Sequence, residues 1–165
     1  MGFFSKLFGK PEENKNDYIY APLSGQSVDI TGVPDPVFAE RMLGNGIAIQ
    51  PTDGRVFSPV DGTVSMMFET GHAVSLVSNT GAEILIHVGL ETVSLQGKPF
   101  VIHAKNGDKV KKGQLLLEAD LEMIRAAGLN TITPVIICNS DEFTQFCVTV
   151  NKSVTNDDVI IELHK

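Results

Sequence analysis

The sequence contains no tryptophan, only two cysteines, and fewer basic than acidic residues. Its 13 Lys and Arg residues stand against 20 Asp and Glu residues, which gives a formal net charge of −7 at pH 7 with His neutral. This balance argues against a nucleic-acid-binding protein, because phosphate binding requires clustered basic side chains. The cysteines, Cys138 and Cys147, lack the CxxC spacing that is typical of redox and zinc motifs.

The sequence also has no apolar run long enough to cross a membrane and no pattern of a secretory signal. We therefore expect a cytoplasmic protein with reduced thiols. With 165 residues, of which 42% are hydrophobic and 20% charged, the chain is long enough for one domain with a substantial core.

The first ten residues, MGFFSKLFGK, differ from the rest of the chain. Their large apolar side chains fall at helical spacing with lysines among them, which is typical of a basic amphipathic segment that lies on an anionic membrane surface. A frayed tail is the alternative, because so short a helix is marginal in water. We expect residues 1–17 to form this tail and a polar linker, and residues 18–165 to form a single domain.

From Tyr18 onward, short apolar runs are interrupted about every eight to twelve residues by Gly, Pro, Asp or Asn. This rhythm predicts an all-β fold, an antiparallel β-sandwich or barrel. Two or three short helices are expected besides the strands, and two of them have clear boundaries.

The segment DPVFAERMLG predicts a helix with Asp35 at the N-cap, Pro36 at the first helical position and Gly44 at its end. The segment DLEMIRAAG repeats this pattern with Asp120 and Gly128.

Two histidines flank a predicted hairpin in GHAVSLVSNTGAEILIHVG. Symmetrical pairing about Asn79 and Thr80 would place His72 directly opposite His87, with Cβ atoms about 5 Å apart. A longer loop with a bulge would instead put the two rings on opposite faces of the sheet. Neighbouring imidazoles repel when both are protonated, so such a pair should stay neutral near pH 7 and keep a nitrogen lone pair available.

Three kinds of chemistry are open to such a pair. A zinc hydrolase requires three protein ligands, but only two histidines are in view and the sequence has no HxH or HExxH motif. A structural metal site would require four ligands. In nucleophilic chemistry, one ring would accept a phosphoryl group from a protein donor, because the sequence has no Walker A motif for ATP. His103 and His164 are interpreted as ordinary hydrogen-bonded residues.

Four segments make a resemblance specific. SPVDGTV, ETGHAVSLVSNTGAEILIHVGLETVSLQGKPF, GDKVKKGQLLLEADL and TPVIICNSDEF occur in this order and resemble the glucose-specific enzyme IIA of the bacterial phosphoenolpyruvate:sugar phosphotransferase system. The resemblance covers nearly all of residues 18–165, and MGFFSKLF resembles that family's membrane-attracted tail. It implies a β-sandwich of the duplicated hybrid motif type and a phosphocarrier that is not an ATP-dependent kinase.

The resemblance also implies roles for individual residues. His87 would carry the phosphoryl group on Nε2, His72 would stabilise it, and Thr70 would orient His72. The donor would be the phosphocarrier histidine protein, and the acceptor would be the IIB domain of a glucose-type sugar permease. The unphosphorylated form is expected to regulate other sugar-uptake proteins or metabolic enzymes.

A shallow, apolar surface should surround the pair, because both partners must reach His87. The candidate docking residues are Asp35, Val37, Phe38, Ile47, Phe68, Val88 and Glu91. The two acidic residues would meet partner arginines. The resemblance implies no required cofactor, although His72 and His87 could hold zinc when a regulated partner adds a carboxylate. The alternative hypothesis is a zinc-dependent peptidase-like protein of similar β topology.

Overall fold

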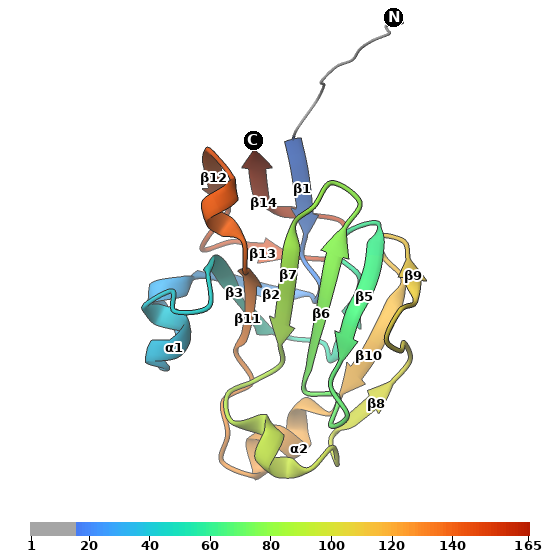
Figure 1. Cartoon of the computed structure of the whole chain (residues 1–165). Coiled ribbons are helices and arrows are strands. Elements are labelled where there is room, and N and C mark those ends of the chain that lie inside the picture. Colours follow the sequence, from blue (N-terminus) through green and yellow to red (C-terminus); the bar gives the residue numbers. More distant parts are fainter. Residues whose placement is uncertain (1–15) are drawn as a thin grey trace, which may run out of the picture.

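The computed structural model describes residues 16–165, which form an antiparallel β fold with short helices (Figure 1). The strands are β1 (Asn16–Tyr20), β2 (Gly25–Asp29), β3 (Asn45–Pro51), β4 (Arg55–Phe57), β5 (Gly62–Met67), β6 (Ala73–Ser78), β7 (Glu83–His87), β8 (Phe100–Ile102), β9 (Lys109–Val110), β10 (Leu115–Ala119), β11 (Thr133–Ile137), β12 (Gln145–Val148), β13 (Ser153–Val154) and β14 (Val159–His164). The α-helices are α1 (Pro36–Ala39) and α2 (Leu121–Ala126), and the 3-10 helices are η1 (Ile30–Gly32), η2 (Thr92–Leu95) and η3 (Ser140–Glu142). The all-β prediction is confirmed.

The strands form three sheets. The largest has eight strands in the order β13-β2-β3-β11-β7-β6-β5-β9, and two three-stranded sheets have the orders β1-β14-β12 and β4-β10-β8. In Figure 1, β1 and β14 lie at the end where the β6–β7 hairpin turns, and β8 and β10 lie behind β5 and β6. The main core packs between these layers; Ile19, Leu76 and Leu117 in it are fully buried.

Strand β7 illustrates how the alternation of the sequence positions the histidine. Ile84 and Ile86 point into the main core, whereas Leu85 and His87 lie on the other face and are only partly buried. A second apolar cluster covers that face, and it includes Phe38 from α1 with Leu85 packed against it. Period-2 alternation therefore brings His87 to the edge of this second cluster.

The predicted helix starts are confirmed. Asp35 caps α1 by accepting a hydrogen bond from the Val37 backbone N–H at 3.0 Å, and Asp120 caps α2 through Met123 N–H. The predicted end of the first helix is wrong, because α1 stops at Ala39 and Arg41 has a left-handed φ of 59°. Residues 40–44 instead form turns.

The predicted boundary between linker and domain is also corrected. β1 begins at Asn16 and pairs with β14, so Asp17 is a strand residue with 7% of its surface exposed. The polar composition of PEENKND suggested an exposed linker. Asp17 is buried in a strand because its carboxylate accepts a hydrogen bond from Ser78, which is distant in sequence. The predicted amphipathic segment at residues 1–10 lies outside the described residues.

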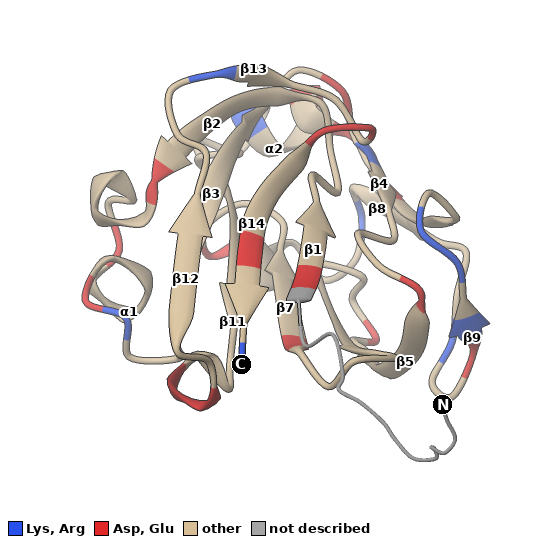
Figure 2. Cartoon of the chain, turned by 90° about the horizontal axis from the view of Figure 1, so that it is seen from above, with Lys and Arg blue, Asp and Glu red and all other residues tan. Residues whose placement is uncertain are grey.

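Charge is distributed unevenly over the surface (Figure 2). Acidic residues occur on several elements, among them β1, β2 and β14, whereas basic residues gather around β9. Across residues 16–165, no helix is long and apolar enough to span a membrane.

Candidate functional site

The site lies at the open end of the β6–β7 hairpin, where the predicted register is wrong by one residue. Ala73, not His72, pairs with His87. The hairpin loop covers residues 79–81, with the Ser78 N–H donating to the Ala82 carbonyl. Because this loop is one residue longer than symmetrical pairing assumed, every cross-strand partner shifts by one position.

The two rings meet nevertheless. Their centroids lie 5.1 Å apart, and their planes are nearly perpendicular, at 83°. His72 precedes the first residue of β6, and its carbonyl accepts a hydrogen bond from Val88 N–H at 2.7 Å. A bend at Gly71, which has a φ of +74°, turns the chain just before His72. The alternation of the strand therefore does not fix the direction of this ring.

Gly71 is required at this bend for two reasons. Its positive φ is a conformation that other residues rarely adopt. In addition, a Cβ atom at this position would lie 2.9 Å from Phe100 Cβ and 3.0 Å from Ile102 Cγ1. The bend is therefore packed closely against β8.

His87 has a defined tautomer. Its Nδ1 lies 2.8 Å from the Gly89 carbonyl oxygen, and since a carbonyl can only accept, Nδ1 must carry the proton. In the neutral ring, Nε2 then keeps its lone pair. The Phe38 ring packs on His87 with a centroid distance of 5.2 Å.

The loop that supplies this carbonyl is itself held in place. Gly89 has a φ of +76°, and a Cβ atom there would lie 2.6 Å from Thr92 Cγ2 and 2.9 Å from the Asn130 carbonyl oxygen. The Thr92 hydroxyl is buried and donates to the Val88 carbonyl at 2.5 Å. The sequence prediction did not name these supporting residues. For Gly89, the only signal in the sequence was that a glycine lies two positions after His87, where the strand ends.

His72 is buried, with 6% of its surface exposed, and it hydrogen-bonds the Thr70 hydroxyl through Nδ1. The Phe68 ring contacts it edge-on at a centroid distance of 5.3 Å. The structure thus brings together all three residues that the resemblance singled out for chemistry: His87, His72 and Thr70.

Both histidines favour the neutral form. Burial, with a contribution from the neighbouring His87, lowers the pKa of His72 from its ordinary value of 6.5 to about 4. Burial also lowers the pKa of His87, although the hydrogen bond to Gly89 and the negative charge of Asp35 oppose this effect. Both rings are therefore uncharged at pH 7, and the Nε2 lone pair of His87 is available as a nucleophile or ligand.

Some predicted docking residues are accessible around the pair. Val37 is 37% exposed, Glu91 is exposed, and Asp35 and Phe68 are partly buried. Phe68 also lines a neighbouring cavity of about 370 Å³. Phe38 is only 4% exposed, so it is not an accessible docking side chain. Its ring instead packs against the ring of His87.

The prediction that Ile47 and Val88 belong to a docking surface is wrong. Both side chains are 0% exposed and belong to the main core. Ile47 lies in a run of four buried residues of β3, Gly46 to Ile49, and Val88 lies between the partly buried His87 and the buried Gly89. Two apolar side chains that the prediction did not name are strongly exposed near these segments of the chain: Met42, 67% exposed after α1, and Val93, 52% exposed in η2. Each occupies a turn, where no periodic pattern separates surface from core.

The described residues, 16–165, contain no group of three or more His, Cys, Asp or Glu side chains placed to hold a metal ion. The histidine pair offers two nitrogen ligands at most. Its chemistry is that of an oriented neutral imidazole beside a second imidazole.

An antiparallel β fold that presents a neutral, oriented imidazole beside a second one is suited to a protein that carries a chemical group on His87 Nε2. Residues 17–143 match the family described as "phosphoenolpyruvate-dependent sugar phosphotransferase system, EIIA 1". The chain belongs to this family. The predicted membership in the phosphotransferase system is thereby confirmed, and the comparisons give no support to the zinc peptidase alternative.

Three similar proteins illustrate the relationship. The "PTS system glucose-specific EIIA component" of Bacillus cereus is 47% identical over 152 residues, which cover 92% of each chain. The "PTS system glucose-specific EIICBA component" of Streptococcus pneumoniae is 50% identical over 123 residues, 74% of this chain and 17% of that protein. The solved structure of glucose permease IIA from Mycoplasma capricolum superposes with a TM-score of 0.83 at 32% identity, covering 98% of this chain and 99% of that one.

Proposed function

We propose that His87 accepts a phosphoryl group on Nε2 from the phosphocarrier histidine protein and passes it to the IIB domain of a glucose-type permease in the cytoplasm. The observation that carries this proposal is the hydrogen bond from His87 Nδ1–H to the Gly89 carbonyl. It fixes the tautomer that leaves Nε2 as the nucleophile, beside a second neutral ring.

In this proposal the transfer changes bonds only at His87 and leaves the protein fold as it is. The Nε2 lone pair attacks the phosphorus atom of the donor phosphohistidine, the donor N–P bond breaks, and the donor imidazole leaves with the electron pair. Nδ1 of His87 keeps its proton throughout and donates it in the hydrogen bond to the Gly89 carbonyl oxygen. In the onward step a IIB cysteine thiolate attacks the phosphorus atom, an S–P bond forms, the His87 Nε2–P bond breaks, and Nε2 recovers its lone pair. Catalysis rests mainly on positioning and charge stabilisation.

His72 stabilises the transferred group. If the Thr70 hydroxyl donates to His72 Nδ1, then His72 Nε2 carries the proton and can donate it in a hydrogen bond to a phosphoryl oxygen. The deeply lowered pKa of His72 ensures that this contact is made by a neutral ring at pH 7. Thr70 therefore acts through His72.

Partners dock on the accessible apolar and acidic residues around the pair. Val37, Phe68, Met42 and Val93 supply the apolar part. Asp35, whose charge partly opposes the lowering of the His87 pKa, and the exposed Glu91 attract basic residues of the partner. Donor and acceptor use the same surface in turn. The similarity to a protein named EIICBA supports a permease-type acceptor.

The unphosphorylated form also suits a regulatory role toward other sugar-uptake proteins or metabolic enzymes. Two neutral imidazoles supply two of the four ligands of a tetrahedral zinc site, and a partner carboxylate and water would complete it. The isolated chain then requires no metal. Membrane contact by residues 1–10 remains a prediction.

The decisive experiment first phosphorylates the phosphocarrier histidine protein with phosphoenolpyruvate and enzyme I, and then mixes this phosphorylated donor with the protein in the presence of EDTA. The intact mass should rise by one phosphoryl group that is labile in acid and stable in alkali. His87→Ala should abolish this increase, whereas His103→Gln, which changes an exposed histidine paired with Glu118, should not. Labelling of His87→Ala, or loss of labelling in EDTA, would contradict the proposal.

A further inference from the structure

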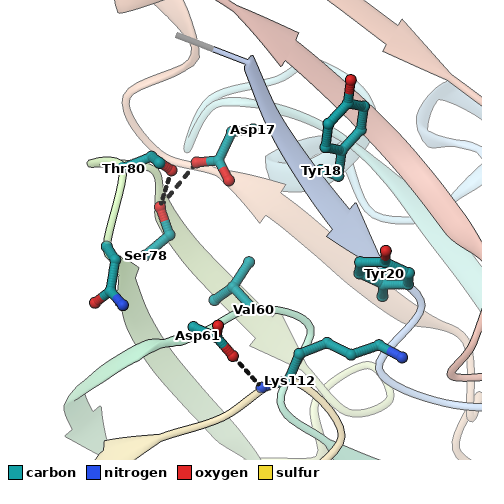
Figure 3. Close-up of a pocket in the computed structure, with 9 residues that line it drawn as sticks. Asp17, Tyr18, Tyr20, Val60, Asp61, Ser78, Thr80 and Lys112 are labelled. Carbon is teal, nitrogen blue, oxygen red and sulfur yellow. Dashed lines mark hydrogen bonds between the residues drawn. The ribbon is translucent and has the colours of Figure 1, made fainter. Parts of the chain in front are cut away.

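A cavity of about 280 Å³ lies at the closed end of the β6–β7 hairpin, opposite the end that bears the histidines (Figure 3). Its lining residues come from β1, the β4–β5 loop, the hairpin turn and the segment after β9. At about 3.3 Å per strand residue, β6 and β7 place it on the order of 20 Å from the histidine pair. A ligand in this cavity would leave the histidines accessible.

A buried carboxyl group faces the cavity. Asp17 is 7% exposed, and its Oδ2 accepts a hydrogen bond from the Ser78 hydroxyl at 2.8 Å. Within residues 16–165, no second donor reaches this carboxyl group. Figure 3 shows the other carboxyl oxygen on the side of Val60, facing the cavity. A buried carboxyl oxygen without a donor is costly, and it indicates a place for one.

The neighbouring hydroxyl groups are oriented so that they can accept as well. The Ser78 oxygen accepts from Ala82 N–H at 2.9 Å and lies 3.0 Å from the Thr80 hydroxyl. Since the single Ser78 proton goes to Asp17, Thr80 must be the donor in its contact with Ser78. The Thr80 oxygen thus keeps lone pairs for a further donor. This end of the cavity is suited to a ligand rich in N–H or O–H groups.

The cavity has an apolar residue at its centre, and the ammonium group of one of its own lining residues, Lys112, lies at its far end. Val60, 4% exposed, lies between the Asp17 and Asp61 side chains in Figure 3. The Lys112 ammonium lies 4.3 Å from the centroid of the Tyr20 ring, a cation–π distance.

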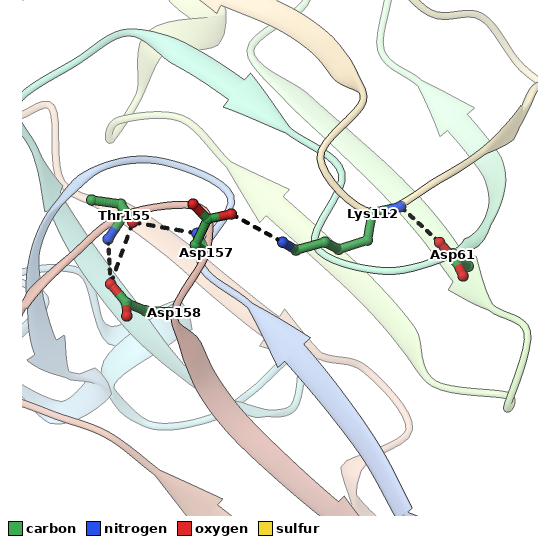
Figure 4. Close-up of polar contacts among 5 residues, drawn as sticks. All are labelled: Asp61, Lys112, Thr155, Asp157 and Asp158. Carbon is green, nitrogen blue, oxygen red and sulfur yellow. Dashed lines mark hydrogen bonds and ion pairs between the residues drawn. The ribbon is translucent and has the colours of Figure 1, made fainter.

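Lys112 is held at this far end by contacts of its own (Figure 4). Its Nζ lies 3.3 Å from Asp157 Oδ1, and its backbone N–H donates to Asp61 at 2.8 Å. Asp157, outside the cavity lining, therefore balances the lysine charge, and the carboxyl group of Asp17 is left for another cation.

We propose that this cavity binds a small primary amine, with the ammonium group donating to Asp17 and Thr80 and the alkyl part lying on Val60. An ammonium group offers three donors, which suit the acceptor oxygens of Asp17 and Thr80. The cavity is slightly smaller than the roughly 300 Å³ at which pockets for drug-sized ligands begin, so the ligand is small.

The test is a titration of the full-length, ¹⁵N-labelled protein with n-butylammonium chloride at low ionic strength, followed by NMR. We expect saturable shifts confined to residues 17–20, 60–61, 78–80 and 112, with a millimolar Kd. The neutral isostere 1-butanol should give no saturable shifts there. Equal binding of 1-butanol, or shifts spread over exposed carboxylates elsewhere, would overturn the proposal, and this comparison requires no variant.

A variant pair isolates Asp17. Asp17→Asn keeps an acceptor for Ser78 but removes the charge, and it should weaken butylammonium binding about tenfold or more, because a charge-assisted hydrogen bond is lost. Glu122→Gln, an equal change of charge on the exposed face of α2, should leave the Kd unchanged. An unchanged Kd in a folded Asp17→Asn variant would refute the assignment. Phosphoryl transfer by His87 is not involved in either measurement.

Discussion

At the residue scale, His72 is the histidine most strongly removed from water. In the unfolded chain it takes up a proton near pH 6.5, but in the folded protein it does so only near pH 4. Between these values the unfolded state binds more protons, so the folded state loses stability as the pH falls. The lowered pKa of His87 acts in the same direction.

This sign can be measured. We expect the free energy of unfolding of the wild type to fall by about 1–2 kcal/mol between pH 7 and pH 5, in urea titrations at each pH. His72→Gln, which cannot titrate, should fall by less. The carboxyl groups whose pKa is lowered, such as Asp53 and Asp108, act at lower pH. A His72→Gln profile parallel to the wild type would contradict the assignment.

Under the proposed function, Thr70 acts on the reaction through the hydrogen bond between its hydroxyl group and His72. Thr70→Val should leave phosphorylation of His87 possible but slow onward transfer to the IIB domain about tenfold, because His72 loses its fixed tautomer. Thr70→Ser should restore most of the rate. Rapid-quench measurement of transfer from the phosphorylated protein separates the two steps, and equal rates for both variants would show that the hydroxyl is dispensable.

At the scale of single elements, the turns that hold the histidines depend on glycines. Gly71→Ala must adopt a positive φ and also push against Phe100 and Ile102, and we expect it to cost about 2–4 kcal/mol. Gly107 offers a matched control, since its φ is +87° and an added Cβ atom would meet nothing within 4 Å. Gly107→Ala should cost only about 1–2 kcal/mol. Equal losses in urea unfolding would mean that the packing against β8 is unimportant.

The helices and strands also show which local features could be predicted from the sequence. Helix starts at Asp35 and Asp120 were predictable, because a capping side chain acts on backbone groups within its own turn. The meeting of His72 and His87 was predicted, although by the wrong register. The bend at Gly71 that actually brings the rings together depends on β8, which follows much later in the chain.

Burial of individual side chains was harder to predict. Ile47 and Val88 were assigned to the docking surface because of their neighbours in sequence, but sheet packing directs them into the core. Asp17 was assigned to a linker because its buried partner, Ser78, is distant in sequence. Local composition cannot report contacts of this range.

At the scale of the whole molecule, we expect acidic side chains near the histidine pair to affect the rate of encounter with the donor more than acidic side chains elsewhere. Glu91→Gln should lower the rate of phosphoryl transfer from the donor several-fold at low salt, and the difference should vanish at high ionic strength, because steering is screened. Glu162→Gln, an equal change on β14, should have no effect. If both variants behaved alike, net charge and not its placement would control the encounter.

The position of β7 in the sheet order has a consequence for fluctuations. β7 is enclosed by β11 on one side and β6 on the other, while β13 and β9 form the ends of the large sheet. Sheet ends fray at low free-energy cost, whereas interior strands open only with the whole domain. We therefore expect the imidazole of His87 to be anchored to slowly exchanging backbone within residues 16–165. Amide exchange should be slowest at Ile84–Ile86, so that the carrier keeps its reactive geometry even while its margins breathe.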